Sequence, residues 1–454
     1  MTVIPTIPIN YIFYGLFITL FSIDYLHNVL NIIPKALTWL PEVIALFMCV
    51  IIILRIALYK DIKISVQYLI LVFCYVLNLL CGIVLNSVPS ESIIIGMRDY
   101  FLFLPFFLFP LVYEFTDQQI KKQLLFILIL LYFQVPLALY QRLFIFKTTY
   151  TGDVVTGTFW GPAPLSLLII SGVCIFYAFY LRNSIGLKTF LVASFILFIP
   201  AMINETKATV FLLPAGLISA SFLEKSQKPF SKIKNIFFMV FILGLMLTVF
   251  TIIYNTFYKD EEKSKGGLFY HIESIYKGKS YLYWGERAED ENDRKVGRID
   301  AIVLAYKKLS NDIGTMFFGM GMGNAHSTGF SILGEQKIDV NEEYGGERNL
   351  ISSMLWETGF LGLLLYLFFL FLFLRDTISL KKSDDFFGTF AIGWISIIAI
   401  MFINLIYKNT FRMNQINLLF FYFSGLVASK AFKFRDVIKR SDTIPSYSSL
   451  PSHR

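Results

Sequence analysis

Uninterrupted apolar runs, each about 20 residues long, recur along most of this 454-residue chain. A run of that length crosses the hydrocarbon core of a bilayer as a helix, whereas a barrel strand alternates over about ten residues. The composition agrees, because 56% of the residues are hydrophobic and 16% are charged, against about 45–50% and about 25% in soluble domains. The sequence therefore predicts an all-α polytopic membrane protein. It excludes a soluble fold, a disulfide scaffold and a disordered chain.

We count twelve candidate spans, and nine of them precede the one long polar segment. The nine cover residues 11–33, 40–58, 64–85, 100–115, 123–144, 164–181, 187–203, 208–223 and 233–257. The last three cover residues 351–374, 386–406 and 413–432. The predicted organisation is therefore nine spans in residues 1–257, a mostly helical extracytoplasmic cap in 258–350, three spans in 351–432 and a disordered tail in 433–454.

Lysine and arginine gather in every second loop between the spans and in the C-terminal tail. Cytoplasmic loops carry this excess, so both termini are predicted to lie in the cytoplasm and the polar segment outside. Residues 258–349 agree, because 16 acidic residues outnumber 13 basic ones there, while the whole chain has a net charge of +8. The basic residues form no continuous face, which excludes nucleic acid as a partner. The expected partner is the lipid bilayer.

The polar segment contains one amphipathic helix, predicted over residues 296–309. Ile299, Ile302, Val303 and Tyr306 form an apolar stripe along it. We expect this stripe to dock the cap on the outer face of the spans.

Several Lys and Arg residues lie on the predicted outer side. They depart from the orientation rule that places such residues in cytoplasmic loops, so the presence of each one needs an explanation. Arg98 precedes the fourth span, where a local ion pair with Asp99 competes with a functional role. Arg298 opens the cap helix; as an isolated helix residue it would usually be a solvated charge. Arg348 immediately precedes the tenth span.

Lys207 is the most unusual of these cations. It lies with Asn204 and Glu205 in the turn INETKAT, which is too short to leave the membrane boundary. A structural pair between Glu205 and Lys207 is the alternative, but charged groups at such a depth favour a function.

A glycine-rich run, FGMGMGN, follows the cap helix. Its backbone N–H groups could approach an anion closely, and the alternative is a helix C-cap followed by a turn. His326 comes next and is the best-placed base among the four histidines. Glu357 lies about one turn inside the tenth span, where it needs a cationic partner from the cap or a structural hydrogen bond. No metal-ligand spacing occurs and the four cysteines lie in apolar runs, so no metal, disulfide or cofactor is expected.

Taken in order, these features resemble the bacterial O-antigen ligase and polymerase superfamily. The matching patterns are VVTGTFWGPAPLSLLI, INETKATVFLLPAGL, GRIDAIVLAYKKLSNDIGTMFFGMGMGN and ERNLISSMLWETGFLGLLLYL. They lie between residues 151 and 373, in the family's order and at its positions relative to the spans. The resemblance implies a multi-pass enzyme of the bacterial inner membrane, with a large outer loop before the last spans.

The resemblance also implies a metal-independent, inverting glycosyltransferase that needs no cofactor. Its partners would be a polyprenyl-diphosphate-linked oligosaccharide donor and a glycan or lipid-linked acceptor, with a chain-length regulator as a further candidate partner. Lys207 and Arg298 match basic positions that stabilise the diphosphate leaving group, and Arg348 would be a third ligand. Ligases of this family carry His-Asn or His-Ser where this chain has Arg348-Asn349, which leaves His326 or Glu347 as the general base. Further substrate contacts are expected from Arg98, Thr158, Asn204, Glu205, Gly321, Gly323, Asn324, Asn349 and Glu357.

Three functions stay open at this point. The missing histidine favours a repeat-unit polymerase of a surface polysaccharide such as O-antigen, capsule or exopolysaccharide. A ligase that transfers the finished glycan to a lipid-A core or another acceptor is the second. A transporter or flippase of lipid-linked oligosaccharide is the third; transporters usually have similar halves, and no such repeat is seen here.

Overall fold

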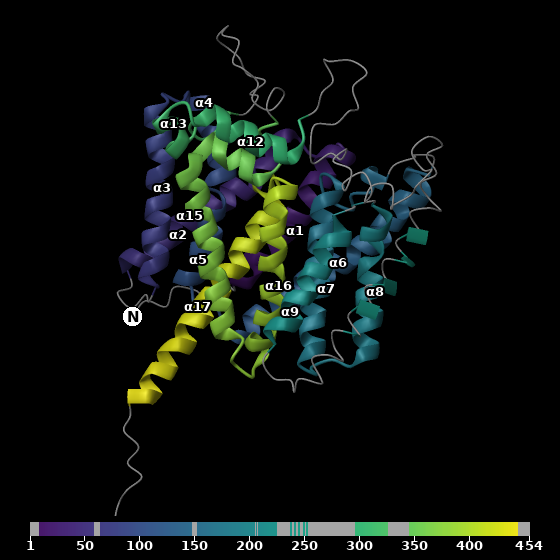
Figure 1. The fold of residues 1–454 in the computed structure, drawn as a ribbon. Helices are drawn as coiled ribbons and strands as arrows, with labels where there is room; N and C mark the ends of the chain where they lie inside the picture. The colour runs from purple at the N-terminus through teal and green to yellow at the C-terminus, as the bar shows by residue number, and fades with distance from the viewer. Residues whose placement is uncertain are drawn as a thin grey trace, which may run out of the picture.

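The computed structural model describes residues 9–58, 64–147, 152–204, 206, 208–224, 296–325 and 345–443, with nine further positions between 237 and 252. Every regular element in these residues is helical, and Figure 1 shows the helices side by side in one bundle. The elements before residue 225 are α1 (Ile9–Asp24), η1 (Tyr25–Val29), η2 (Lys35–Trp39), α2 (Leu40–Leu58), α3 (Val66–Leu85), α4 (Ser90–Tyr100), α5 (Phe103–Val112), α6 (Asp117–Tyr140), η3 (Gln141–Ile145), η4 (Gly152–Val154), α7 (Pro162–Leu181), α8 (Leu187–Ile203) and α9 (Thr209–Leu223). Those after residue 295 are α12 (Arg298–Leu309), α13 (Ile313–Phe318), α15 (Leu350–Leu380), α16 (Phe386–Tyr407), η7 (Thr410–Arg412) and α17 (Asn414–Thr443).

Seven helices among the described residues are long and apolar enough to cross a membrane. An eighth span results if α4 and α5, which meet at a 47° bend, are taken together, and α8 and α9 are shorter apolar helices. These lengths confirm the predicted class, a helical membrane protein. Most of the ninth predicted run, residues 233–257, and the tail beyond residue 443 lie outside the described residues.

Two helices differ from their predicted extents. α15 is interrupted at Gly359, whose φ of 70° is in the left-handed region that favours glycine. α17 continues to Thr443, so residues 433–443 are helical where the sequence predicted a disordered tail. The reason lies in Asp376 of α15, which is buried and accepts hydrogen bonds from Tyr68 Oη at 2.9 Å and from Arg435 Nη1 of α17 at 2.6 Å. This contact fixes the extension of α17 to the bundle.

Helices α12 and α13 lie across one end of the bundle, which we call the α12 end (Figure 1). α12 packs against α15, and α13 packs against α3 and α15. The predicted apolar stripe of α12 is wrong in detail, because Val303 and Tyr306 are 43% and 56% exposed. The buried stripe is instead Ala301, Ala305 and Leu309. Two of these side chains are small, which lets α12 lie close to α15.

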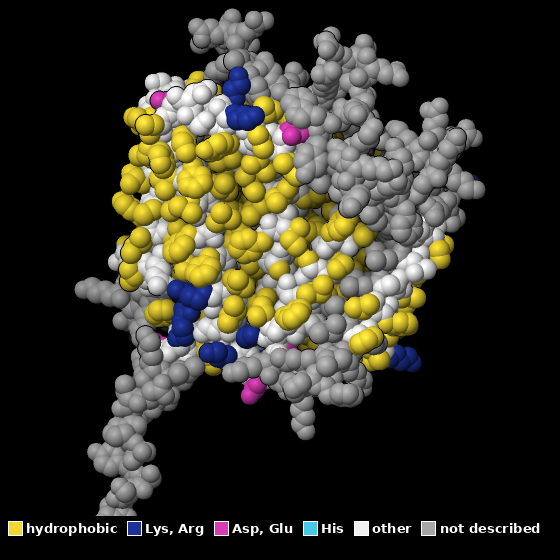
Figure 2. All heavy atoms as spheres, in the orientation of Figure 1, with side chains coloured by type: hydrophobic (Ala, Val, Ile, Leu, Met, Phe, Trp, Pro, Cys, Tyr) yellow, Lys and Arg dark blue, Asp and Glu magenta, His cyan; other side chains and the backbone are white. Residues whose placement is uncertain are grey.

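Charged side chains gather at the two ends of the bundle, with an apolar band between them (Figure 2). At the end opposite α12, Arg182 contacts Glu224 at 3.1 Å and Arg435 contacts Asp376. Lys430 also pairs with Asp117 at this end. The apolar band has the character of a membrane-facing surface, while the assignment of the ends to cytoplasm and outside stays a prediction.

Candidate functional site

Arg298 is fixed where α12 begins beside the last residue of α16. Its Nε donates a hydrogen bond to the carbonyl oxygen of Tyr407 at 2.6 Å, and its guanidinium lies 4.7 Å from the centre of the Tyr407 ring. Such stacking suits arginine, whose planar group is weakly hydrated. Arg298 therefore joins α12 to the α12 end of α16.

Arg348 is brought to the same place by its neighbour Asn349. Asn349 is fully buried and is the N-cap of α15, where its Oδ1 accepts a hydrogen bond from the Ser352 N–H at 2.8 Å. Its Nδ2 donates to the carbonyl oxygen of Arg298, also at 2.8 Å. The beginnings of α12 and α15 are thus tied together, and the two predicted arginines lie at one junction. Asn349 has a structural role there, and its predicted substrate contact stays a prediction.

Lys408 is the third cation at this junction. It follows Tyr407 as the C-cap of α16, and part of its side chain is open to solvent. Desolvation by surrounding protein lowers the pKa of Lys408, and the positive charges of Arg298 and Arg348 lower it further, whereas Asp153 opposes them. We call Arg298, Arg348 and Lys408 the basic cluster. Like charges gathered in this way are costly unless an anion is bound among them.

Lys408, and Arg412 in the same loop, are not among the site residues predicted from the sequence. Both were visible in principle, because IYKNTFRMN connects the eleventh and twelfth predicted spans on the outer side, where lysine and arginine are unexpected.

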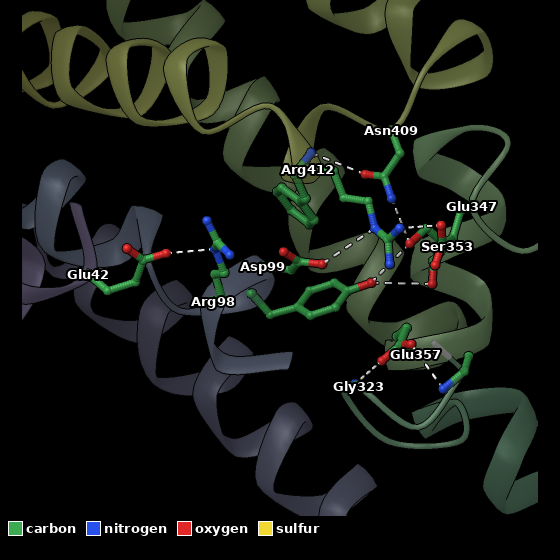
Figure 3. A network of polar contacts seen from close by, with 12 residues as sticks. Glu42, Arg98, Asp99, Gly323, Glu347, Ser353, Glu357, Asn409 and Arg412 are labelled. Atoms are coloured by element: carbon green, nitrogen blue, oxygen red, sulfur yellow. Dashed lines mark hydrogen bonds and ion pairs between the residues drawn. The ribbon is translucent and has the colours of Figure 1, made fainter. Parts of the chain in front are cut away.

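Next to the basic cluster, Arg412 lies between two carboxylates (Figure 3). It forms an ion pair with Glu347 and lies 3.8 Å from Asp99. Arg98 does not make the local pair with Asp99 that the sequence left as an alternative. It contacts Glu42 of α2 at 2.6 Å and stacks on the ring of Trp39 at 5.2 Å. Neighbours in a helix point about 100° apart, so each of Arg98 and Asp99 meets a different partner.

The elements behind this network are held by uncharged hydrogen bonds. Asn409 Nδ2 donates to Ser353 Oγ at 3.0 Å, and Tyr100 Oη lies 3.3 Å from the same oxygen. These contacts join α4, α15 and the loop before η7, and all three residues are buried. The charged side chains of this network therefore belong to elements that these hydrogen bonds hold in place relative to one another.

The carboxylate of Glu357 accepts hydrogen bonds from the backbone of the glycine-rich run. Its Oε2 accepts a hydrogen bond from the Gly323 N–H, and its Oε1 accepts one from the Ala325 N–H at 3.0 Å. Glu357 is 1% exposed. The structural hydrogen bond that the sequence left open is thus present. The N–H groups that were expected to approach an anion bind this carboxylate.

The glycines of the run also permit close backbone packing. Gly321 and Gly323 have φ values of 86° and 78°. A Cβ on Gly321 would lie 2.8 Å from the carbonyl oxygen of Gly82 in α3. Asn324 Nδ2 donates to the carbonyl oxygen of Met320 at 3.0 Å. These contacts account for the run structurally, and substrate binding by Gly321, Gly323 and Asn324 stays a prediction.

Thr158 and Asn204 lie around the start of α7, also at the α12 end. The backbone N–H and Oγ1 of Thr158 donate to Gln134 Oε1 at 2.9 and 3.1 Å. Asn204 is fully buried and donates from Nδ2 to Ser166 Oγ at 2.7 Å and to the carbonyl oxygen of Pro162 at 3.0 Å. Both side chains position the local backbone, and neither predicted substrate contact is tested by these bonds.

Three predicted site residues, Glu205, Lys207 and His326, lie outside the described residues. Within the described ranges, no group of three or more His, Cys, Asp or Glu side chains could hold a metal ion. The sequence matches no protein-family model, and no curated protein shows significant similarity to it. The sequence motifs and the geometry of the basic cluster are therefore the features that indicate a function.

Proposed function

We propose that this protein is a glycosyltransferase that polymerises the repeat units of a surface polysaccharide. The donor is an oligosaccharide on a polyprenyl diphosphate at the outer leaflet of a bacterial inner membrane, and the acceptor is a sugar hydroxyl of the next unit. The single observation that carries the proposal is the basic cluster, in which Arg298 and Arg348, singled out by sequence, lie together with Lys408 at the α12 end. Twelve spans, cytoplasmic termini and an outer cap are part of the same proposal.

The chemistry needs positive charge at such a place. As the acceptor oxygen bonds to the anomeric carbon from one side, the bond to the diphosphate oxygen breaks on the other, and the configuration inverts. The electron pair leaves on the diphosphate, so negative charge grows there in the transition state. The basic cluster is suited to stabilise this negative charge, because arginine makes bidentate contact with phosphate oxygens and lysine supplies a compact positive charge. Lys207 is proposed as a further ligand.

A base must take the proton of the acceptor hydroxyl. Glu347 is the described candidate, since it directly precedes Arg348 in the chain and its carboxylate lies beside the basic cluster, where it forms an ion pair with Arg412. His326 is the second candidate. It follows Ala325, whose N–H is bound by Glu357.

The function is tested by removing the protein from its cell and measuring the length of the surface glycan. A polymerase predicts that single repeat units replace long chains, and that the wild-type gene restores the chains. Long chains that accumulate on the lipid carrier would instead identify a ligase. Undiminished chain length together with lipid-linked units retained on the cytoplasmic side would identify a transporter.

The pH dependence of donor binding should report on Lys408. Because its folded-state pKa lies below the ordinary value of 10.5, Lys408 loses its charge at a lower pH than an exposed lysine. Donor affinity should therefore fall as the pH rises through this lowered pKa. Lys408→Arg stays charged over the whole range, so it should remove this alkaline decrease. The decrease is measured by the binding of a labelled polyprenyl diphosphate between pH 7 and pH 10. An identical decrease in Lys408→Arg would show that Lys408 is not its cause.

A further inference from the structure

A cavity of about 320 Å³ lies between α6, α7, α16 and α17, away from the basic cluster. Its lining is apolar except for two described side chains, Lys121 and Ser171. Ser171 Oγ already donates to the carbonyl oxygen of Leu167 at 2.7 Å, so the wall offers water little to bind. A volume of about ten liquid waters (~30 Å³ each) without polar partners does not hold water stably. The cavity is partly open to its surroundings, and in a membrane these are lipid chains.

The cavity is long enough for the greater part of an acyl chain. Along α6 its lining runs from Lys121 to Leu131, ten residues or about 15 Å of helix, and along α16 from Phe386 to Met401, fifteen residues or about 22 Å. These lengths are between half and three quarters of the roughly 30 Å hydrocarbon core. Lys121 lies near the start of α6 and Phe386 begins α16, so this end of the cavity is at the membrane boundary opposite α12.

The positive charge of Lys121 at this end of the cavity favours a lipid with an anionic head group. Lys121 is exposed, and its Nζ lies 5.0 Å from the centre of the Phe386 ring, with no carboxylate partner for it among the described residues. Nearby Asp117 is paired with Lys430. An ammonium at the mouth of an apolar cavity matches a lipid whose phosphate carries an uncompensated negative charge. We propose that this cavity binds one acyl chain of an anionic phospholipid, whose head group contacts Lys121.

Trp394 makes this proposal measurable. It lines the cavity, is 5% exposed, and its indole N–H donates to Ser424 Oγ at 3.1 Å. Because the ring is buried in the bundle and lines the cavity, a chain inside the cavity lies closer to it than a lipid outside the bundle does. Bromine atoms on an acyl chain quench tryptophan fluorescence only at short range.

The experiment reconstitutes the full-length protein in phosphatidylcholine vesicles that contain a small fraction of brominated phosphatidylglycerol or brominated phosphatidylcholine. The signal is the quenching that disappears in Trp394→Phe. We expect this Trp394 quenching to be at least twofold stronger with brominated phosphatidylglycerol than with brominated phosphatidylcholine. Lys121→Glu should lower it to the phosphatidylcholine level, and the matched control Lys122→Glu should not.

A second pair of variants tests the cavity itself. Ser171→Phe places a ring in the cavity and should reduce the quenching by both lipids. Ser219→Phe is the control, because Ser219 makes the same hydrogen bond to the residue four positions earlier but does not line the cavity. Absence of Trp394 quenching, equal quenching by both lipids, or equal effects of the two lysine variants would overturn the proposal. Displacement of the brominated chain by a polyprenyl phosphate, but not by phosphatidylglycerol, would also overturn it.

Discussion

Replacing Arg348 by alanine is expected to slow glycan transfer about 100- to 1000-fold, the loss typical of one preorganised transition-state donor. Arg348 gives the cleanest test in the basic cluster. Its backbone N–H donates to the Gly345 carbonyl oxygen at 3.0 Å whatever the side chain, and no hydrogen bond or ion pair joins its guanidinium to another described residue. Arg298, by contrast, also holds α12 to Tyr407, so its loss would mix a structural effect with a chemical one.

The measurement is polymer synthesis by the purified protein in vesicles with a synthetic polyprenyl-diphosphate donor. Arg348→Lys should recover part of the rate, because lysine keeps the charge but loses the paired contact with phosphate. Lys307→Ala is the matched control: it removes an exposed positive charge from the last turn of α12 and should change the rate less than twofold. A wild-type rate in Arg348→Ala would remove Arg348 from the mechanism.

The orientation rule explains why part of this site could be predicted from sequence. Arg298 and Arg348 are predictable because cations on the predicted outer side of a membrane are unexpected, and this rule needs no knowledge of packing. The same rule applies to Lys408, in the loop after the eleventh predicted span. The rule does not predict that these residues lie together in the fold. Their proximity depends on the hydrogen bond that Asn349 donates to the Arg298 carbonyl oxygen.

The fold likewise has parts that the sequence predicts and parts that it does not. Span length alone identifies long apolar helices, because a bilayer imposes it. The buried face of α12 could not be found in the same way. Large apolar residues usually mark a core, yet here Ala301 and Ala305 are buried and Tyr306 is exposed, since close approach to α15 requires small side chains. The partner of Glu357 was also beyond sequence reasoning, because backbone N–H donors are present at every residue except proline.

Replacing Glu357 by alanine should release the glycine-rich run from α15. The change removes both acceptors of the Gly323 and Ala325 N–H groups in a buried place, and each orphaned donor costs about 1–3 kcal/mol. A local loss of about 3 kcal/mol corresponds to roughly 100-fold faster amide exchange. We therefore expect hydrogen exchange at residues 319–325 to accelerate by that factor. Glu91→Ala, at an exposed position of α4, should leave it unchanged.

The same variant separates the two roles open to Glu357. If the carboxylate only positions the run, activity should fall together with protection, and Glu357→Gln should lose less of both, because the amide keeps one oxygen acceptor. If Glu357 touches the substrate, Glu357→Gln should abolish transfer while residues 319–325 stay protected. Unchanged exchange in Glu357→Ala would contradict the structural role altogether. The geometry favours positioning, since both oxygens of the carboxylate already accept backbone hydrogen bonds in a site closed to solvent.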